Sequence, residues 1–235
     1  MKEVALDSTH GTNAYDYQLT TLMVIDEHGE GFPAAFCFSN HVNEAAMRIF
    51  LSVCKEAIGQ TLHNAVLMTD DTEVYHNAWC HVMVQPAYRL LCTWHIDRAW
   101  GKNLVKVCGD CVLKATVYKT LRAVMELQDQ EVFADKMAEF LLSAKGDDKT
   151  CEFATYFEKQ YANRPQLWAY CYRLGMQIHH NMHLEALHRV LKHVHLNGRK
   201  VRRRDKCIHA LLRLLRTKCT TVSRKLTREN AQGMC

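Results

Sequence analysis

The sequence has few of the residues that interrupt regular structure, with 3 prolines and 10 glycines among 235 residues. It also lacks a long hydrophobic run, because the apolar stretch at Ala65–Met68 is far too short to cross a bilayer. No charged segment followed by an apolar one opens the chain, so we expect no secretory signal. With 48% hydrophobic residues, this composition excludes a disordered chain and predicts a globular protein.

The 11 cysteines are odd in number and scattered along the chain. Most lie in apolar segments such as Ala34–Phe38 and Tyr170–Tyr172. This distribution predicts buried, reduced thiols in the cytosol or nucleus rather than a disulfide scaffold.

The formal net charge of +5 conceals a division between two parts of the chain. Residues 189–235 carry 14 Lys or Arg against 2 Asp or Glu, a net charge of +12, and residues 1–188 have a net charge of −7. This asymmetry predicts an acidic body joined to a basic arm.

Strand-like and helix-like segments alternate in the first hundred residues. The predicted strands are rich in β-branched, aromatic and other apolar residues: Val4–Leu6, Tyr17–Ile25, Phe32–Phe38, Ala65–Met68 and Arg89–Trp94. Helical spacing of apolar residues marks Asn43–Ile58 and Val74–His81. This order of elements is typical of an RNase H-like α/β fold, in which a mixed sheet is flanked by helices.

Helical periodicity dominates after Trp100, for example at Leu121–Leu127 and Val132–Leu142. We therefore divide the chain into a first part of the RNase H-like core (1–99), a helical insertion (100–175), a further core helix (176–196) and a basic C-terminal helical arm (197–235).

Two aspartates, Asp7 and Asp70, stand where an apolar strand runs out into polar residues. Side chains at strand ends converge on a crevice in open α/β sheets, and carboxylates are ligands for hard divalent cations. The alternative is that each aspartate only caps the turn that follows its strand.

A third acid, Glu185, is the only one between Arg164 and Arg204. It belongs to a polar stripe with helical spacing beside an apolar helix face: Asn181, Glu185, His188 and Lys192. This position favours a role in a site, although a lone acid among cations can also form a surface ion pair.

Four segments in the right order resemble the Mutator-like element (MULE) transposases. Asp7–Asn13 (DSTHGTN) resembles the first catalytic motif, and Met68–Asp71 followed by Tyr75–Trp79 resembles the second. Cys92–His95 (CTWH) matches the cysteine–histidine motif, and Asn181–His188 (NMHLEALH) resembles the block that carries the catalytic glutamate. The resemblance extends over about residues 2–196 and includes a helical insertion before the glutamate.

The resemblance implies that Asp7, Asp70 and Glu185 hold two Mg²⁺ or Mn²⁺ ions that serve to cut DNA and join its 3′ ends to a target. It places a further set of residues next to this site: His10, Cys92, His95, Asn181 and His188. Of the two adjacent acids, Asp70 is taken as the ligand because the family's aspartate directly follows the threonine. Asp71 is then expected to cap the next helix.

A zinc site is the competing interpretation of the cysteines and histidines. Cys92, His95, Cys108 and Cys111 have acceptable zinc-ligand spacing, but strand alternation would direct Cys92 and His95 to opposite faces. We therefore do not expect zinc. The histidines near Glu185 are interpreted as a polar helix face beside a nucleic-acid groove.

The start of the basic arm is a cluster of cations: Arg199, Lys200, Arg202, Arg203 and Arg204. It is predicted to bind DNA phosphates or to act in nuclear import, and the alternative is a solvated loop. The helix that follows is expected to pack through Ile208, Leu211, Leu212 and Leu215.

Three functions are compatible with these features. The favoured one is a DNA transposase catalytic domain. The second is a domesticated, catalytically silent protein with a DNA-binding or regulatory function, and the third is an RNase H-type nuclease. We expect DNA as partner, nuclear location after import from the cytoplasm, no membrane and no small-molecule substrate, and leave a homo-oligomer open. Because no DNA-binding domain precedes Asp7 here, we expect weak, salt-dependent binding without sequence preference and no transposition by this chain alone.

Overall fold

The computed structural model describes residues 2–232, apart from the side chains of Arg204 and of residues 221–232. Its first part alternates strands and helices in the following order: β1 Lys2–Thr9, β2 Gln18–Ile25, β3 Gly31–Ser39, α1 Glu44–Ile58, β4 Ala65–Thr69, α2 Glu73–Val82 and β5 Tyr88–Leu91. Helices form the remainder: α3 Thr93–Asn103, α4 Cys111–Met125, α5 Gln130–Gly146, α6 Cys151–Phe157, α7 Met182–Val190 and α8 Arg204–Gln232, with short 3₁₀ or π segments between several of them.

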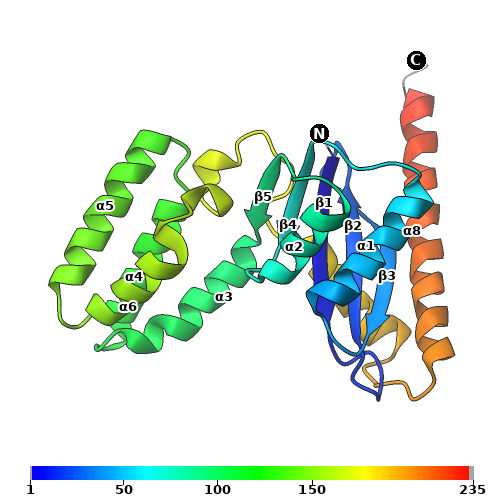
Figure 1. Ribbon diagram of the computed structural model, residues 1–235, viewed down its shortest axis with the longest axis horizontal. Coiled ribbons are helices and arrows are strands. Elements are labelled where there is room, and N and C mark those ends of the chain that lie inside the picture. Colours follow the sequence, from blue (N-terminus) through cyan, green and yellow to red (C-terminus); the bar gives the residue numbers. More distant parts are fainter. Residues whose placement is uncertain (1, 233–235) are drawn as a thin grey trace.

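The five strands form one mixed sheet in the order β3-β2-β1-β4-β5 (Figure 1). Strand β1 is in the middle, antiparallel to β2 and parallel to β4, and β4 is parallel to β5. The tight turn between β2 and β3 is closed by two backbone hydrogen bonds at Asp26. The Asp26 N–H donates to the carbonyl of Glu30, and the Asp26 carbonyl accepts from the N–H of Gly29. The predicted α/β fold with a mixed sheet is thereby confirmed.

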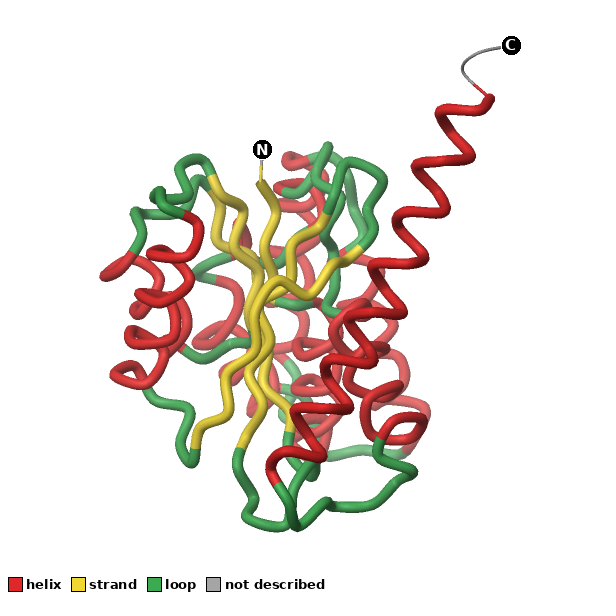
Figure 2. The backbone as a smooth tube through the Cα atoms, turned by 90° about the vertical axis from the view of Figure 1, so that its right-hand side faces the viewer, coloured by secondary structure: helices red, strands yellow, loops and turns green. Residues whose placement is uncertain are grey.

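Successive side chains of β1 point alternately into two different hydrophobic clusters, one on each face of the sheet. Val4 and Leu6 pack into a cluster with residues of α1 and α2, whereas Ala5 packs into a cluster with residues of α7 and α8. Since successive side chains of a strand point to opposite faces, Asp7 lies on the same face as Ala5. Figure 2 shows the sheet edge-on with helices on both sides.

Helix α7 approaches the sheet closely. A Cβ atom added to Gly31, the first residue of β3, would collide with Met23 and with His183 of α7, so only glycine fits there. The buried carboxylate of Glu3 accepts hydrogen bonds of 3.0 and 3.1 Å from the backbone N–H of Gln177, just before α7. These contacts determine how closely α7 approaches the sheet.

Between Thr93 and Tyr172 the described chain forms helices and their connections. Their core is an aromatic cluster in which Trp100 makes edge-to-face contacts with Phe157, Tyr161 and Trp168. The fully buried Arg173 connects this region to the sheet, because its guanidinium donates to the carbonyls of Leu91 and Leu167. In Figure 1 helices α4–α6 stand beside the β5 edge. The boundaries of the proposed insertion stay a prediction.

The strand predicted over Arg89–Trp94 is wrong in its second half. Strand β5 ends at Leu91, Cys92 is the residue before α3, and Thr93, Trp94 and His95 form the first turn of that helix. The argument that strand alternation separates Cys92 from His95 therefore fails. Ile96 and Trp100, four residues apart and both buried, show the helical spacing that α3 follows.

Helix α8 packs on the α7 side of the sheet through Cys207, Ala210, Leu211 and Leu214. The predicted packing face was wrong in part, because Ile208 and Leu212 are about half exposed. Within the described residues no helix is long and apolar enough to span a membrane. The cysteines described form no disulfide, and the prediction of buried thiols holds only in part: Cys54, Cys92, Cys171 and Cys207 are buried, whereas Cys108, Cys111 and Cys219 are exposed.

Candidate functional site

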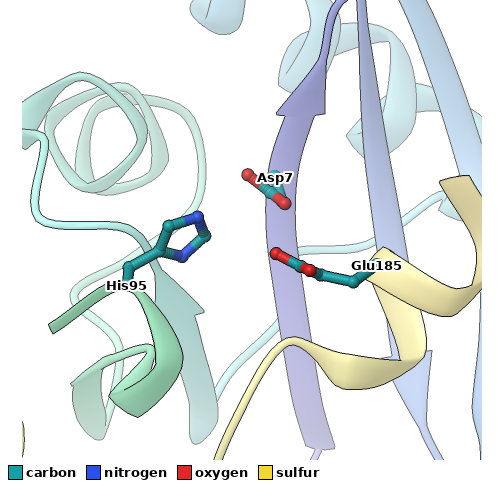
Figure 3. A group of neighbouring side chains, drawn as sticks. All are labelled: Asp7, His95 and Glu185. Atoms are coloured by element: carbon teal, nitrogen blue, oxygen red, sulfur yellow. The ribbon is translucent and has the colours of Figure 1, made fainter. Parts of the chain in front are cut away.

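Three side chains that could hold a metal ion converge beside β1. Asp7, His95 and Glu185 each offer a ligand atom, and these atoms all lie within 4.8 Å of one another. Figure 3 shows Asp7 on β1, the His95 ring reaching in from α3, and the Glu185 carboxylate reaching in from α7. Of the predicted triad, Asp7 and Glu185 are therefore brought together, and His95 completes the group.

The local fold explains this convergence. Asp7 lies on the central strand and pairs with Thr21 of β2, and the Thr21 hydroxyl is 3.0 Å from Nε2 of His188 on α7. His188 is buried, and this contact holds α7 against β2 beside Asp7. Glu185 is one helical turn before His188 and is thus carried to the same edge.

Asp7 is an unusual carboxyl group because it is only 8% exposed. Its pKa is raised to about 7, mainly by burial and also by the nearby carboxylates of Asp70 and Glu185, against a hydrogen bond from the Ser8 N–H and the charge of Lys192. Burial also raises the pKa of Glu185, which Arg98 and Lys192 oppose. Two acids whose charges are disfavoured in the folded protein are what a cation would stabilise.

Asp70 lies at the end of β4, close enough to influence the pKa of both Asp7 and His95. Its Oδ1 accepts hydrogen bonds from the backbone N–H and the hydroxyl of Thr72, at 3.2 and 2.9 Å. Its carboxylate is not part of the 4.8 Å group formed by Asp7, His95 and Glu185. The structure thus places Asp70 next to the site without including it in the tightest cluster.

The expectation that Asp71 caps the following helix is wrong. Thr72 is the residue before α2, and Asp71 instead forms an ion pair with Arg164, 2.7 Å away. Arg164 belongs to the helical region far along the chain, so Asp71 connects that region to the loop that carries Asp70.

A pocket of about 310 Å³ opens at the carboxylates. Its walls combine acids, histidines and cations from β1, α3 and the α7 side: Asp7, Ser8, Thr9, Trp94, His95, Arg98, Glu185, His188, Arg189, Lys192 and His193. Burial lowers the pKa of Lys192, while Glu185 and Asp7 raise it. Burial lowers the pKa of His188 to about 4, so this imidazole is neutral near pH 7.

The other residues predicted next to the site occupy three kinds of position. His188 and His95 line the pocket. Cys92 and Asn181 are buried behind it, where the Asn181 N–H donates to the Cys92 sulfur at 3.2 Å. His10 is exposed in the loop after β1, near Asp16, and is not among the residues that line the pocket.

Cys108 and Cys111 lie exposed around the start of α4. In the described part of the chain, the only group of three or more histidine, cysteine or acidic ligands is Asp7, His95 and Glu185. Cys92 and His95 are therefore not grouped with Cys108 and Cys111.

The start of the basic arm runs beside the loop that follows β1. Val201 pairs with Asn13 in a parallel bridge, and Lys200 forms an ion pair with Asp16 at 2.7 Å. Arg203 is paired with Asp205 at 2.6 Å, and Arg199 and Arg202 are exposed. The side chain of Arg204 lies outside the described residues.

Sequence reasoning missed Arg98, Arg189 and His193 as residues of the pocket. Arg98 is three residues after His95, a spacing that places two side chains on one helix face. Recognising that α3 begins at Thr93 would have identified Arg98, since the motif and the arginine then share a helix.

Comparison with known families agrees with this arrangement. Residues 3–99 match the family model described as the MULE transposase domain. This part of the chain, from β1 into α3, is therefore a MULE transposase domain, as its motifs predicted. The match contains Asp7, Asp70 and His95, whereas Glu185 lies beyond it. A search of curated proteins found no match to the chain.

Proposed function

We propose that this protein is the catalytic domain of a DNA transposase, RNase H-like in fold, that cuts and joins DNA phosphodiesters at Asp7, Asp70 and Glu185. The observation that carries the proposal is the convergence of Asp7 and Glu185, from opposite ends of the chain, in a pocket of a MULE transposase domain. The strand order 3-2-1-4-5, with only β2 antiparallel to its neighbours on both sides, supports the fold.

The donor set suits a divalent cation. Two carboxylates and one imidazole within 4.8 Å can share one ion, and the pKa values of Asp7 and Glu185 stay raised by burial although Lys192 opposes the shift at both. Nδ1 of His95 is buried without a hydrogen-bond partner in the described structure. Carboxylates favour Mg²⁺ or Mn²⁺, and the imidazole makes Mn²⁺ the better accommodated of the two.

The roles of the chain's own residues follow from their positions. Asp7 would hold the ions from the central strand, together with Glu185 from α7 and Asp70 from the end of β4. The ions, when bound, supply a nucleophile and stabilise the leaving oxygen. His188, neutral and hydrogen-bonded to Thr21, positions α7 and takes no proton.

Nicking of supercoiled plasmid tests the proposal. The wild-type protein should nick in Mn²⁺ and, more slowly, in Mg²⁺, and Asp7→Asn, Asp70→Asn and Glu185→Gln should each lower the rate on the order of 10⁴-fold. Asp135→Asn, an exposed acid on α5, is the matched control and should nick as the wild type does. Metal binding without nicking would instead support the domesticated, catalytically silent alternative.

The same proposal includes DNA as substrate and a nuclear location, for which the basic segment 199–204 is the import candidate. Fluorescence microscopy of the tagged chain, with and without substitution of Arg199, Lys200 and Arg202, tests the location. If the variant accumulates in the nucleus to the same level as the wild type, segment 199–204 is not the nuclear import signal.

A further inference from the structure

Three cations line the carboxylate pocket, where Glu185 influences two of them, Arg98 and Lys192, through space. Arg98 comes from α3, Arg189 from α7 and Lys192 from the π-helical segment Leu191–His195 that continues α7. Within the described residues, none of the three forms a salt bridge. Their positive charge is therefore available to an anionic ligand.

The basic arm differs in this respect. Lys200 and Arg203 already contact carboxylates of the protein, Asp16 and Asp205. A phosphate that bound either cation would have to compete with that carboxylate. In the pocket, Asp7 and Glu185 lie near the cations without forming an ion pair with them in the described structure, so three cations that are not ion-paired surround the carboxylates.

The two walls of the pocket also hold their cations differently. The Arg98 guanidinium lies over the Trp94 ring, 4.6 Å from its centroid, a contact that limits the freedom of the arginine before any ligand binds. Lys192 is half-buried, and Arg189 is exposed at the rim. Asp7 and Glu185 lie in the same pocket as these three residues.

We propose that Arg98, Arg189 and Lys192 form a phosphate clamp that grips the backbone of the DNA strand on both sides of the bond to be cut. This inference rests on the proposed function for the identity of the bond, and it adds the residues that bind the strand. The arginines suit two-pronged contacts with phosphate oxygens, and the lysine acts as a point charge. Contacts of this kind carry no base information, so the clamp is independent of sequence.

DNA affinity at several salt concentrations tests the clamp without catalysis. Binding of a short fluorescein-labelled duplex of random sequence is followed by anisotropy in the absence of divalent metal. Each phosphate contact that is lost should reduce the slope of log K against log salt by about 0.9, so Arg189→Gln/Lys192→Gln should reduce it by about 1.8. Lys192→Arg should retain the wild-type slope because it retains the charge.

Lys119→Gln, on the exposed surface of α4, is the matched control and should leave the slope unchanged. If the double variant does not fold, as judged by circular dichroism, Arg98→Gln gives the same reading from an exposed position on α3. An unaltered slope in a folded variant would overturn the clamp. So would an unaltered slope together with tighter Mn²⁺ binding, since the cations would then serve only to neutralise Asp7 and Glu185.

The outcome separates the clamp from the proposed function. If the salt slope is reduced in the double variant but the wild-type protein does not nick plasmid, the proposed nuclease activity is refuted and the clamp remains as a DNA-binding site. Nicking by the wild type with an unchanged slope in the variants would refute the clamp alone. If both proposals hold, Arg189→Gln/Lys192→Gln should raise KM for plasmid about 10-fold or more, because uniform binding is lost.

Discussion

The two faces of the sheet are built from alternate residues of the same strands, yet they differ in chemistry. On the α1–α2 face, Leu6, Leu67 and Trp79 belong to a cluster of buried hydrophobic residues without a charged side chain, and its Tyr75 hydroxyl donates to Ser8. On the α7–α8 face, the apolar cluster stops short of β1's end, where Asp7 takes the position that a further apolar residue would occupy. One face is therefore committed to stability, and the other gives up some apolar burial for a charged pocket.

Substitutions on the two faces should therefore have different effects. Changes on the α1–α2 face should alter the free energy of unfolding while leaving the geometry of the carboxylates unchanged. Changes on the α7–α8 face should alter metal binding, DNA binding and the pH dependence of stability.

Removal of the Asp7 carboxylate should separate function from stability most strongly. Asp7→Asn is expected to abolish metal-dependent nicking, on the order of 10⁴-fold, while the metal-free protein becomes more stable at neutral pH because a disfavoured buried charge is gone. Plasmid nicking and urea denaturation of the same preparation measure the two effects. A variant that is both inactive and unfolded would contradict this separation.

Truncation on the opposite face should have the reverse signature. Trp79 is completely buried between α2 and the sheet, so Trp79→Ala should cost about 3–5 kcal/mol of unfolding free energy. Below its midpoint of denaturation, the variant should bind Mn²⁺ with wild-type affinity, which calorimetry can measure. A large loss of metal affinity in the folded variant would show that the two faces are coupled.

The pH dependence of the free energy of unfolding should arise mainly from Asp7, on the α7–α8 face of the sheet. The pKa of Asp7 is raised from 3.8 to about 7, so between these values the folded state binds more protons than the unfolded state. Stability of the metal-free protein should accordingly fall by about 1–3 kcal/mol as pH rises through this window. Denaturation midpoints at pH 4.5 and pH 7.5 measure the fall, which should be smaller in Asp7→Asn and in the presence of Mn²⁺. An equal fall in Asp7→Asn would assign it to other groups.

An effect of similar size should come from loss of the hydrogen bond that holds α7 to the sheet. Thr21→Val keeps the shape of the side chain and leaves Nε2 of the buried His188 without its partner, so a loss of about 1–3 kcal/mol is expected. Thr20→Val, at a neighbouring position on the other face, offers the comparison, because its hydroxyl contacts Ser8 instead. Only Thr21→Val should weaken Mn²⁺ binding, through a looser Glu185.

The strands and the carboxylates on them could be predicted from local patterns. Val4–Leu6 and Ala65–Met68 are apolar runs that end in aspartates, and the helix over Met182–His195 was found from its stripe of polar residues. In the structure this helix continues as a π-helical segment from Leu191, a change of hydrogen-bonding pattern that residue spacing does not reveal.

Errors arose where distant contacts decide the outcome. Thr93 and Trp94 favour strands by residue type, but burial of Ile96 and Trp100 against the helical region turns the segment into α3. Asp71 has the residue type of a helix cap, but Arg164 engages its carboxylate from 93 positions along the chain. Because the third helix was missed, so was Arg98 and with it the cationic wall of the pocket.

The long sequence separation between Asp7 and Glu185 also affects the order in which the two residues become available during synthesis of the chain. The ribosome makes the chain from its N-terminus, so β1 and Asp7 emerge early, and Glu185 follows only after the helices between Thr93 and Tyr172 have been synthesised. Until then the newly made chain holds Asp7 and His95 but lacks Glu185, the third member of the group. A chain interrupted anywhere in those helices would keep the aspartate and lack the glutamate.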